Sequence, residues 1–171
     1  MIVRDAVFDD MPAIVEIYNA LIGTTTVAWT ETEQTLEQRE LWFRWTRERG
    51  LPVLVAEHDD NVIGFTAYGD FRGAGVWPGY RHTVEHTIHV RESSWGLGIG
   101  RTLLTELIER ARAAGIHVMV GAIDGDNVES IRFHERLGFG VVARMPEVGR
   151  KFDRWLDLVL VQRILTEAEP A

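Results

Sequence analysis

The sequence predicts one α/β domain whose mixed sheet is mostly antiparallel and is flanked by helices. Apolar segments typical of strands alternate with amphipathic helical patterns along the chain. The first half places two strand patterns on either side of a short polar turn, which is typical of an antiparallel hairpin. The 171 residues are 46% hydrophobic, enough for one sizeable core. We expect the domain to span residues 1–165 and residues 166–171 to form a disordered tail.

The first half of the chain contains two helical and three strand patterns. Acidic residues and a proline, which are capping signals, open the first helix, and Gly50 ends the second. The polar run His58–Asn61 separates two strands and predicts the hairpin turn. The expected elements are a strand at 2–6, helices at 10–22 and 33–49, and strands at 53–57 and 62–70.

The second half alternates strands and helices after a glycine-containing loop at 71–80. The helix that begins after Gly100 carries its leucines on one face and stops at Gly115. A second, shorter helix is closed by Gly138. The expected elements are strands at 82–90, 116–120, 140–148 and 155–163, and helices from 101 to about 114 and from 127 to 137.

Three alternating glycines, Gly96, Gly98 and Gly100, lie between a strand and a helix. Such glycines let the main chain approach a bulky anion, and the helix start adds unpaired N–H groups and a positive dipole end. A P-loop would need Lys-Ser/Thr after the last glycine, and a dinucleotide fingerprint would need glycine where Arg101 stands. The pattern therefore indicates another kind of phosphate cradle, with a purely structural glycine turn as the alternative.

The two segments around these helices resemble the signatures of the GCN5-related N-acetyltransferases (GNAT family). Trp95–Gly100 is similar to the family's loop Gln/Arg-x-x-Gly-x-Gly/Ala, except that Trp95 replaces the usual cation or amide. Asn127–Phe139 follows the second signature nearly letter by letter, and residues 2–14 resemble the family's first strand and helix. The resemblance covers residues 1–165 and implies a GNAT fold with splayed central strands.

The resemblance implies acetyl-CoA as the cosubstrate and assigns groups that hold it. Pantetheine is expected to pair with the main chain of a strand, and one N–H there would polarise the thioester carbonyl. The phosphates are expected on the glycine loop, with arginines 101, 132 and 136 as candidate cations; solvated surface arginines are the alternative. The expected cofactor-binding residues are Ile88, His89, Val90, Gly96, Leu97, Gly98, Ile99, Gly100, Arg101, Asn127 and Ser130.

Glu85 and His134 are the expected catalytic residues. Acetyl transfer requires an unprotonated amine, and Glu85 matches the glutamate that serves as base in the phosphinothricin-type branch of the family, directly or through a water. His134 stands where many members carry a tyrosine and is a candidate proton donor to the departing thiolate. The alternatives are a surface glutamate on a strand and a histidine that packs against CoA.

The substrate expected from this branch is a small amino acid such as phosphinothricin, methionine sulfoximine or methionine sulfone, acetylated on its α-amino group. Arg72 and Arg81 are candidates for the α-carboxylate because a guanidinium matches its two oxygens. Aromatic residues are candidate pocket walls, although core packing also explains them. The expected substrate-binding residues are Trp29, Phe71, Arg72, Tyr80, Arg81 and Glu85, with Trp77 in a loop longer than is usual for the branch.

The sequence also bears on other classes of function. The run from His82 to His86 is an inverted zinc-peptidase motif, but a strand would place Glu85 on the opposite face from both histidines. The net charge of −8 argues against nucleic acid, and no apolar stretch is long enough to span a membrane. The sequence contains no cysteine and no signal pattern, so we expect a cytoplasmic protein, and the resemblance implies a homodimer. Acetylation of a polyamine, an aminoglycoside or a protein N-terminus, and a non-catalytic acyl-CoA-binding module, remain open.

Overall fold

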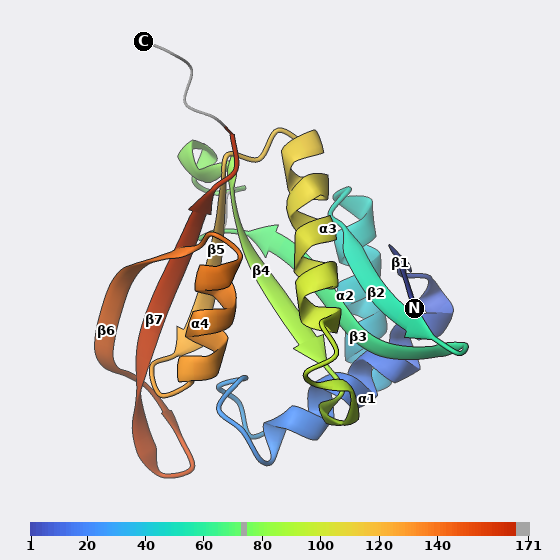
Figure 1. The fold of residues 1–171 in the computed structure, drawn as a ribbon, viewed down its shortest axis with the longest axis horizontal. Helices are drawn as coiled ribbons and strands as arrows, with labels where there is room; N and C mark the ends of the chain where they lie inside the picture. Colours follow the sequence, from blue (N-terminus) through green and yellow to red (C-terminus); the bar gives the residue numbers. More distant parts are fainter. Residues whose placement is uncertain (73–74, 167–171) are drawn as a thin grey trace. The chain divides into compact units, whose positions relative to one another are not determined.

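The computed structural model describes residues 1–72 and 75–166. Their strands form a sheet in the order β1-β2-β3-β4-β5-β7-β6 (Figure 1). The chain divides into two compact units, described separately below: the first comprises Met1–Tyr68 and Thr87–Leu107, the second Gly69–His86 and the residues from Ile108 onward. Strand β4 (Thr83–Val90) and helix α3 (Ile99–Ala113) each run from one unit into the other.

The remaining elements follow the predicted order. In the first half they are β1 (Ile2–Asp5), α1 (Met11–Ile22), α2 (Leu36–Glu48), β2 (Val53–His58) and β3 (Asn61–Asp70). In the second half they are β5 (Val118–Asp124), α4 (Val128–Arg136), β6 (Gly140–Lys151) and β7 (Arg154–Ile164). Short 3-10 turns lie at Phe8–Asp10, Pro78–Tyr80 and Glu92–Ser94. The α/β class and the mainly antiparallel sheet predicted from the sequence are confirmed.

The first unit is built on the hairpin of β2 and β3. Asp59 and Asp60 form its turn with φ of 48° and 60°, a left-handed pair that suits the twist of the two strands. Helices α1 and α2 contribute apolar side chains to a core formed with these strands. The buried cluster contains Ala6, Met11, Ile14, Ile17, Phe43, Val53, Val55, Val62, Phe65 and Ala67.

Gly64 sets how closely β4 and α3 approach β3 within the first unit. A Cβ placed at Gly64 would lie 3.0 Å from the carbonyl oxygen of His89 and 3.2 Å from Cδ1 of Leu103. Leu103 and Leu104 are fully buried, so the N-terminal half of α3 is held by its apolar face. The lack of a side chain at Gly64 therefore allows β4 to lie tightly against β3 where β4 leads into the glycine loop.

The second unit pairs β5 with β4 on one side and with β7 on the other. The register of β5 and β7 is antiparallel from Val118↔Ile164 to Asp124↔Leu158, and β6 and β7 form a long hairpin (Figure 1). The parallel register of β4 and β5 covers Thr83–Glu85 and Val118–Val120, whereas the two strands extend to Val90 and Asp124. This short ladder agrees with the splayed central strands expected from the family resemblance.

Element boundaries differ from the predictions where capping decides them. Helix α2 begins at Leu36 rather than near residue 33, because Thr35 and Gln38 form a capping box. The Thr35 hydroxyl accepts from the main-chain N–H of Gln38, and Oε1 of Gln38 accepts from the main-chain N–H of Thr35. β5 begins at Val118 rather than Ile116, because the Ile116 N–H is used to close helix α3 on the Ala111 carbonyl. The predicted tail at 166–171 lies outside the described residues, apart from its first residue.

Candidate active site

The glycine loop leads directly into α3 in the first unit. Gly96 and Gly98 both have φ of 78°, a left-handed conformation that glycine adopts without strain. A Cβ at either position would meet nothing within 4 Å, and Leu97 is 71% exposed, so the loop offers an open main-chain surface. The structure also shows that α3 begins at Ile99, so Gly100 belongs to the first helical turn. N–H groups of that turn have no partner within the helix and suit the phosphates of CoA.

Trp95 uses its indole to hold the end of β4. Nε1 of Trp95 donates to the Val90 carbonyl at 2.8 Å, so this side chain stabilises the strand-to-loop connection. Trp95, which replaces the cation or amide usual in the family pattern, therefore stabilises the local structure instead. Of the three residues expected to meet pantetheine, His89 is buried and Ile88 and Val90 are partly buried. The open glycine loop thus follows directly on the strand whose main chain is expected to meet pantetheine.

Glu85 lies in the second unit, at the last position where β4 is paired with β5. Its side chain is solvent-exposed, yet the protein around its carboxylate removes part of its hydration and raises the pKa of Glu85 above its ordinary value. A carboxylate with a raised pKa is a better proton acceptor near neutral pH than an ordinary surface glutamate. The exposed position also leaves it accessible to a substrate or to water.

His134 is buried on α4 within a cluster of rings in the second unit. Its imidazole lies 5.1 Å from that of His86 and 5.4 Å from the ring of Phe139, between ring centroids, and Phe133 covers its edge. Nδ1 donates to the Ser130 carbonyl at 2.7 Å, so Nε2 is the free acceptor of the neutral ring. Burial lowers the pKa of His134, although the bond to Ser130 opposes the shift.

Asn127 and Ser130 lie together at the start of α4. Oδ1 of Asn127 accepts from the Ser130 main-chain N–H at 3.0 Å and caps the helix. The second family signature therefore begins with a residue that fixes the helix on which His134 is carried. Arg132 and Arg136, the expected phosphate cations of this helix, are exposed, and Arg101 in the other unit is exposed as well.

Three of the expected substrate residues are brought together in the second unit. The rings of Phe71 and Tyr80 meet edge to face at 5.6 Å between centroids, and the Arg72 guanidinium lies 5.7 Å from the Tyr80 ring centre. Arg81 is exposed and donates to the Pro78 carbonyl at 3.3 Å. Trp29 lies in the first unit, partly buried, in the segment between α1 and α2. Part of the 71–80 loop, residues 73 and 74, lies outside the described residues.

A cavity that sequence reasoning did not predict lies in the first unit. It measures about 210 Å³ and is lined by Tyr18, Gln34, Gln38, Arg39, Trp42, Phe65, Thr87 and His89. Arg39 is 5% exposed, on the same helix face as the buried residues Phe43 and Thr46. The signal that could have identified it is a charged residue on the apolar stripe of an amphipathic helix.

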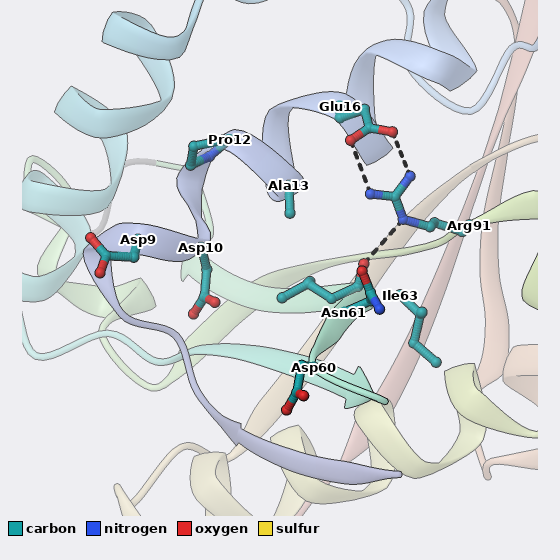
Figure 2. A pocket seen from close by; sticks show the side chains of 10 residues that line it. Asp9, Asp10, Pro12, Ala13, Glu16, Asp60, Asn61, Ile63 and Arg91 are labelled. Atoms are coloured by element: carbon teal, nitrogen blue, oxygen red, sulfur yellow. Dashed lines mark hydrogen bonds and ion pairs between the residues drawn. The ribbon is translucent and has the colours of Figure 1, made fainter.

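A second hollow in the first unit is larger, about 570 Å³, and acidic (Figure 2). Two of its four carboxylates form ion pairs: Glu16 binds Arg91 at 2.6 Å, and Asp10 binds Arg4 at 2.7 Å. Arg91 also donates to the main chain of β3, at the Val62 carbonyl. These bonds tie α1 and the end of β4 to the sheet, so Asp10, Glu16 and Arg91 have a structural use in this hollow.

Neither a metal-binding cluster nor a membrane-spanning helix is found in the described part of the chain. Between residues 1 and 72 and between 75 and 166, no group of three His, Cys, Asp or Glu side chains is arranged to hold a metal ion. Residues His82–His86, which carry the zinc-peptidase pattern, lie on strand β4 or immediately before it, as predicted. Among the helices of the described chain, none is long and apolar enough to cross a membrane.

Comparison with known proteins shows which family this sequence resembles. The model of the acetyltransferase (GNAT) family matches residues 14–139. An L-methionine sulfoximine/L-methionine sulfone acetyltransferase from Pseudomonas aeruginosa is 48% identical over 161 residues, 94% of this chain and 92% of the relative.

Solved structures agree with the sequence relatives. The structure of yncA from Salmonella typhimurium with its cofactor acetyl-CoA is 42% identical, with a TM-score of 0.93 over 99% of this chain and 96% of the other. A phosphinothricin acetyltransferase from Sinorhizobium meliloti, in complex with acetyl-CoA, is 34% identical with a TM-score of 0.92, over 99% of this chain and 92% of the other.

Proposed function

This chain belongs to the GNAT acetyltransferase family, and we propose that it transfers the acetyl group of acetyl-CoA to the α-amino group of a small amino acid. Methionine sulfone, methionine sulfoximine and phosphinothricin are the substrates that the named relatives support. The observation that carries the proposal is Glu85, which combines an exposed carboxylate with a raised pKa on the strand that leads into the glycine loop. A binding module would have no use for a base prepared in this way.

Acetyl-CoA, when bound, supplies the acetyl group as an activated thioester. In our proposal the phosphates bind the main-chain N–H groups of residues 96–100, and Arg101 adds a positive charge. The main chain of Ile88, His89 and Val90 positions pantetheine, and one N–H there withdraws electrons from the thioester carbonyl. Asn127 and Ser130 complete the binding set as the start of α4.

Glu85 acts as the general base in this proposal. An α-amino group is largely protonated at neutral pH, and only its neutral form has the lone pair that forms the new N–C bond. The Glu85 carboxylate accepts the proton, directly or through one water. The raised pKa brings the carboxylate closer to the pKa of the group that it must deprotonate, which makes the transfer less unfavourable.

His134 is the candidate that returns a proton to the CoA sulfur when the C–S bond breaks. Its Nδ1 is committed to the Ser130 carbonyl, and its lowered pKa favours the neutral ring. Nε2 must therefore accept a proton before it can donate one, so His134 acts as a relay rather than as a stored acid.

The substrate side of the proposal rests on residues around the 71–80 loop. Arg72 and Arg81 are proposed to bind the α-carboxylate, because both are exposed and a guanidinium donates to two carboxylate oxygens at once. Phe71, Tyr80 and Trp29 are proposed as apolar walls. The contact between Phe71 and Tyr80 supports this grouping for two of the three.

We further propose a cytoplasmic homodimer. The β6–β7 hairpin exposes apolar side chains, among them Met145, Phe152 and Trp155 at 43%, 43% and 61% exposure. Exposed apolar groups that gather on one element are typical of interaction surfaces. Size-exclusion chromatography with light scattering distinguishes the dimer from a monomer.

The proposed activity is tested by incubating the protein with acetyl-CoA and methionine sulfone and identifying the product by mass spectrometry. We expect a product heavier by one acetyl group, with the acetyl on the α-nitrogen. Glu85→Gln should slow its formation about 10²- to 10⁴-fold while leaving acetyl-CoA binding unchanged. Normal acetyl-CoA binding without any acetylated product would instead support a binding module.

A further inference from the structure

Arg39 is a buried cation without a carboxylate partner. Among the described residues none supplies an acid to it, and its Nε and Nη2 are covered from solvent without a hydrogen-bond acceptor. Three aromatic rings pack around the guanidinium instead: those of Tyr18, Trp42 and Phe65 have their centres 4.8, 4.7 and 5.6 Å away. These contacts stabilise the charge in part, but they do not satisfy its N–H donors.

The remaining groups of this cavity are polar and fixed in place. The main chain of Gln34 is held to α1 by two hydrogen bonds with the Asn19 side chain. The Gln34 carbonyl accepts from Nδ2 of Asn19 at 2.8 Å, and the Gln34 N–H donates to Oδ1 of Asn19 at 3.0 Å. Oε1 of Gln38 accepts from the Thr35 N–H, which leaves its amide NH₂ as a donor. The Thr87 hydroxyl is 2.9 Å from Nε2 of His89. The cavity thus offers donors at a rigid polar wall and apolar contact on its aromatic sides.

The cavity carries a positive charge with no negative charge opposite it among the described residues that line it. Burial lowers the pKa of Arg39 to about 10, so the side chain is still positively charged at neutral pH. Burial, with a contribution from Arg39, lowers the pKa of His89 to about 4, so that neighbour is neutral. A positive charge with unused donors and a neutral histidine beside it favours an oxygen-rich, electron-rich guest.

We propose that this cavity, defined by Arg39 with Tyr18, Trp42, Phe65, Thr87 and His89, receives the oxygen-bearing end of the substrate side chain. The inference rests on the proposed function and names Arg39 as a specificity-determining residue. Sulfone, sulfoximine and phosphinate groups share the required chemistry: a tetrahedral centre with at least one oxygen that accepts from a guanidinium, next to an apolar methyl group that contacts aromatic rings.

The size and position of the cavity fit such a group. A volume of about 210 Å³ equals roughly seven water molecules at ~30 Å³ each, enough for the end of a small side chain. Thr87 comes two residues after Glu85 on β4, and alternate residues of a strand share a face. Glu85 and the cavity residue Thr87 thus lie on the same face of one strand.

The test compares steady-state kinetics of the wild type with Arg39→Met, and with Arg47→Met as the matched control. Arg47 lies on the same helix and also stacks on a ring, 5.7 Å from the centre of Phe43, but is exposed. Three compounds are used as substrates or competitive inhibitors. They are methionine sulfone, its α-carboxamide, which lacks the carboxylate, and methionine, which lacks the sulfone oxygens. CoA binding and thermal melting establish that each variant is folded.

We expect Arg39→Met to raise KM for methionine sulfone at least about tenfold, the loss of a hydrogen bond to a charged group. The same fold-rise in KM is expected for the α-carboxamide, whereas the KM or inhibition constant of methionine should change less than about twofold. In the presence of CoA, methionine sulfone should raise the Tm of the wild type and of Arg47→Met but not of Arg39→Met. If Arg39→Met does not fold, Arg39→Lys replaces it, with a smaller rise in KM expected because an ammonium cannot donate as a fork.

Three results would overturn the inference. An unchanged KM in a folded Arg39 variant would assign Arg39 a purely structural role. An equal effect on methionine and methionine sulfone would show that the sulfone is not the group bound. If Arg39→Met raises KM for methionine sulfone but not for its α-carboxamide, Arg39 binds the α-carboxylate rather than the sulfone. All three require a wild type that acetylates amino acids, so failure of the proposed function is seen separately as absence of wild-type turnover.

Discussion

Gly121 on β5 leaves the space that the imidazole of His86 occupies. A Cβ added at Gly121 would lie 2.9 Å from Nε2 of His86 and 3.0 Å from Cγ2 of Val161, both closer than packed carbon atoms normally approach. His86 in turn packs against His134, with their ring centroids 5.1 Å apart. A residue without a side chain on one strand thus determines where the candidate proton relay of α4 can lie.

Gly121→Ala should therefore both destabilise the fold and disturb His134. Because His86 is buried among rings, it cannot move away cheaply, and we expect a loss of about 1–3 kcal/mol in the free energy of unfolding. Urea denaturation measures this loss, and kcat should fall with it. Gly23→Ala is the control, since its Cβ meets nothing within 4 Å and its φ is −73°. Equal stability of the two variants would contradict the account.

Glu85→Gln should remove catalysis without weakening the fold. Loss of a general base lowers kcat about 10²- to 10⁴-fold. Because the folded protein raises the pKa of Glu85, ionising this group costs native stability as pH rises above the unfolded pKa of about 4.5. The variant should be as stable as the wild type at pH 7, or slightly more so, by thermal melting. A large drop in Tm would instead indicate a structural carboxylate.

The pH dependence of turnover gives an independent check on Glu85. In the wild type, kcat/KM should rise with pH through the raised pKa of this carboxyl group, because only the ionised form accepts a proton. In a folded Glu85→Gln variant the residual rate should lack that limb. If kcat/KM rises with pH in the same way in the wild type and in Glu85→Gln, the titrating group is not Glu85.

His89 should make the protein sensitive to mild acid. Its pKa falls from 6.5 in the unfolded chain to about 4 in the fold, mainly through burial and also through Arg39. The unfolded state therefore binds the proton first, and stability is lost as pH falls from about 6.5 to 4, by up to about 3 kcal/mol. Urea midpoints at pH 7 and pH 4.5 measure the loss. His89→Gln should be less pH-sensitive over this window, and an unchanged slope would refute the assignment.

Gly98→Val tests the glycine loop. At φ of 78° a β-branched residue is strained, so the loop must adopt another path and lose its alignment with the start of α3. We expect at least a tenfold rise in the acetyl-CoA dissociation constant by calorimetry, with a Tm that changes by only a few degrees because the loop is exposed. Gly23→Ala again serves as the control. Unchanged affinity would mean that the phosphates bind elsewhere.

Much of the fold could be predicted because local signals and packing agree. The Asp59–Asp60 turn, the glycine stop after α3 and the alternating strands are short-range features, and all were found near their predicted positions. Boundaries moved where side chains compete with periodicity, as in the reciprocal bonds of Thr35 and Gln38 that start α2. The family resemblance supplied the splay of β4 and β5, which no periodicity in this sequence indicates.

The candidate site was less accessible to sequence reasoning. Motifs indicate Glu85 and His134, but their shifted pKa values arise from lost hydration around the Glu85 carboxylate and from burial of His134, which depend on the packing of distant segments. Arg39 was missed because a single arginine in an amphipathic helix looks like a surface residue until the rings of Tyr18 and Phe65 are placed around it. Trp95 could be recognised as an exception, whereas its bond to Val90 required the loop geometry.

The most direct test of the proposed function follows CoA release with a thiol reagent while acetyl-CoA is offered a panel of amines. The panel contains methionine sulfoximine, methionine sulfone, phosphinothricin, spermidine, an aminoglycoside and a peptide with a free N-terminus. Turnover confined to the three amino acids is the predicted result. Turnover only with the other amines, or with none, would contradict it.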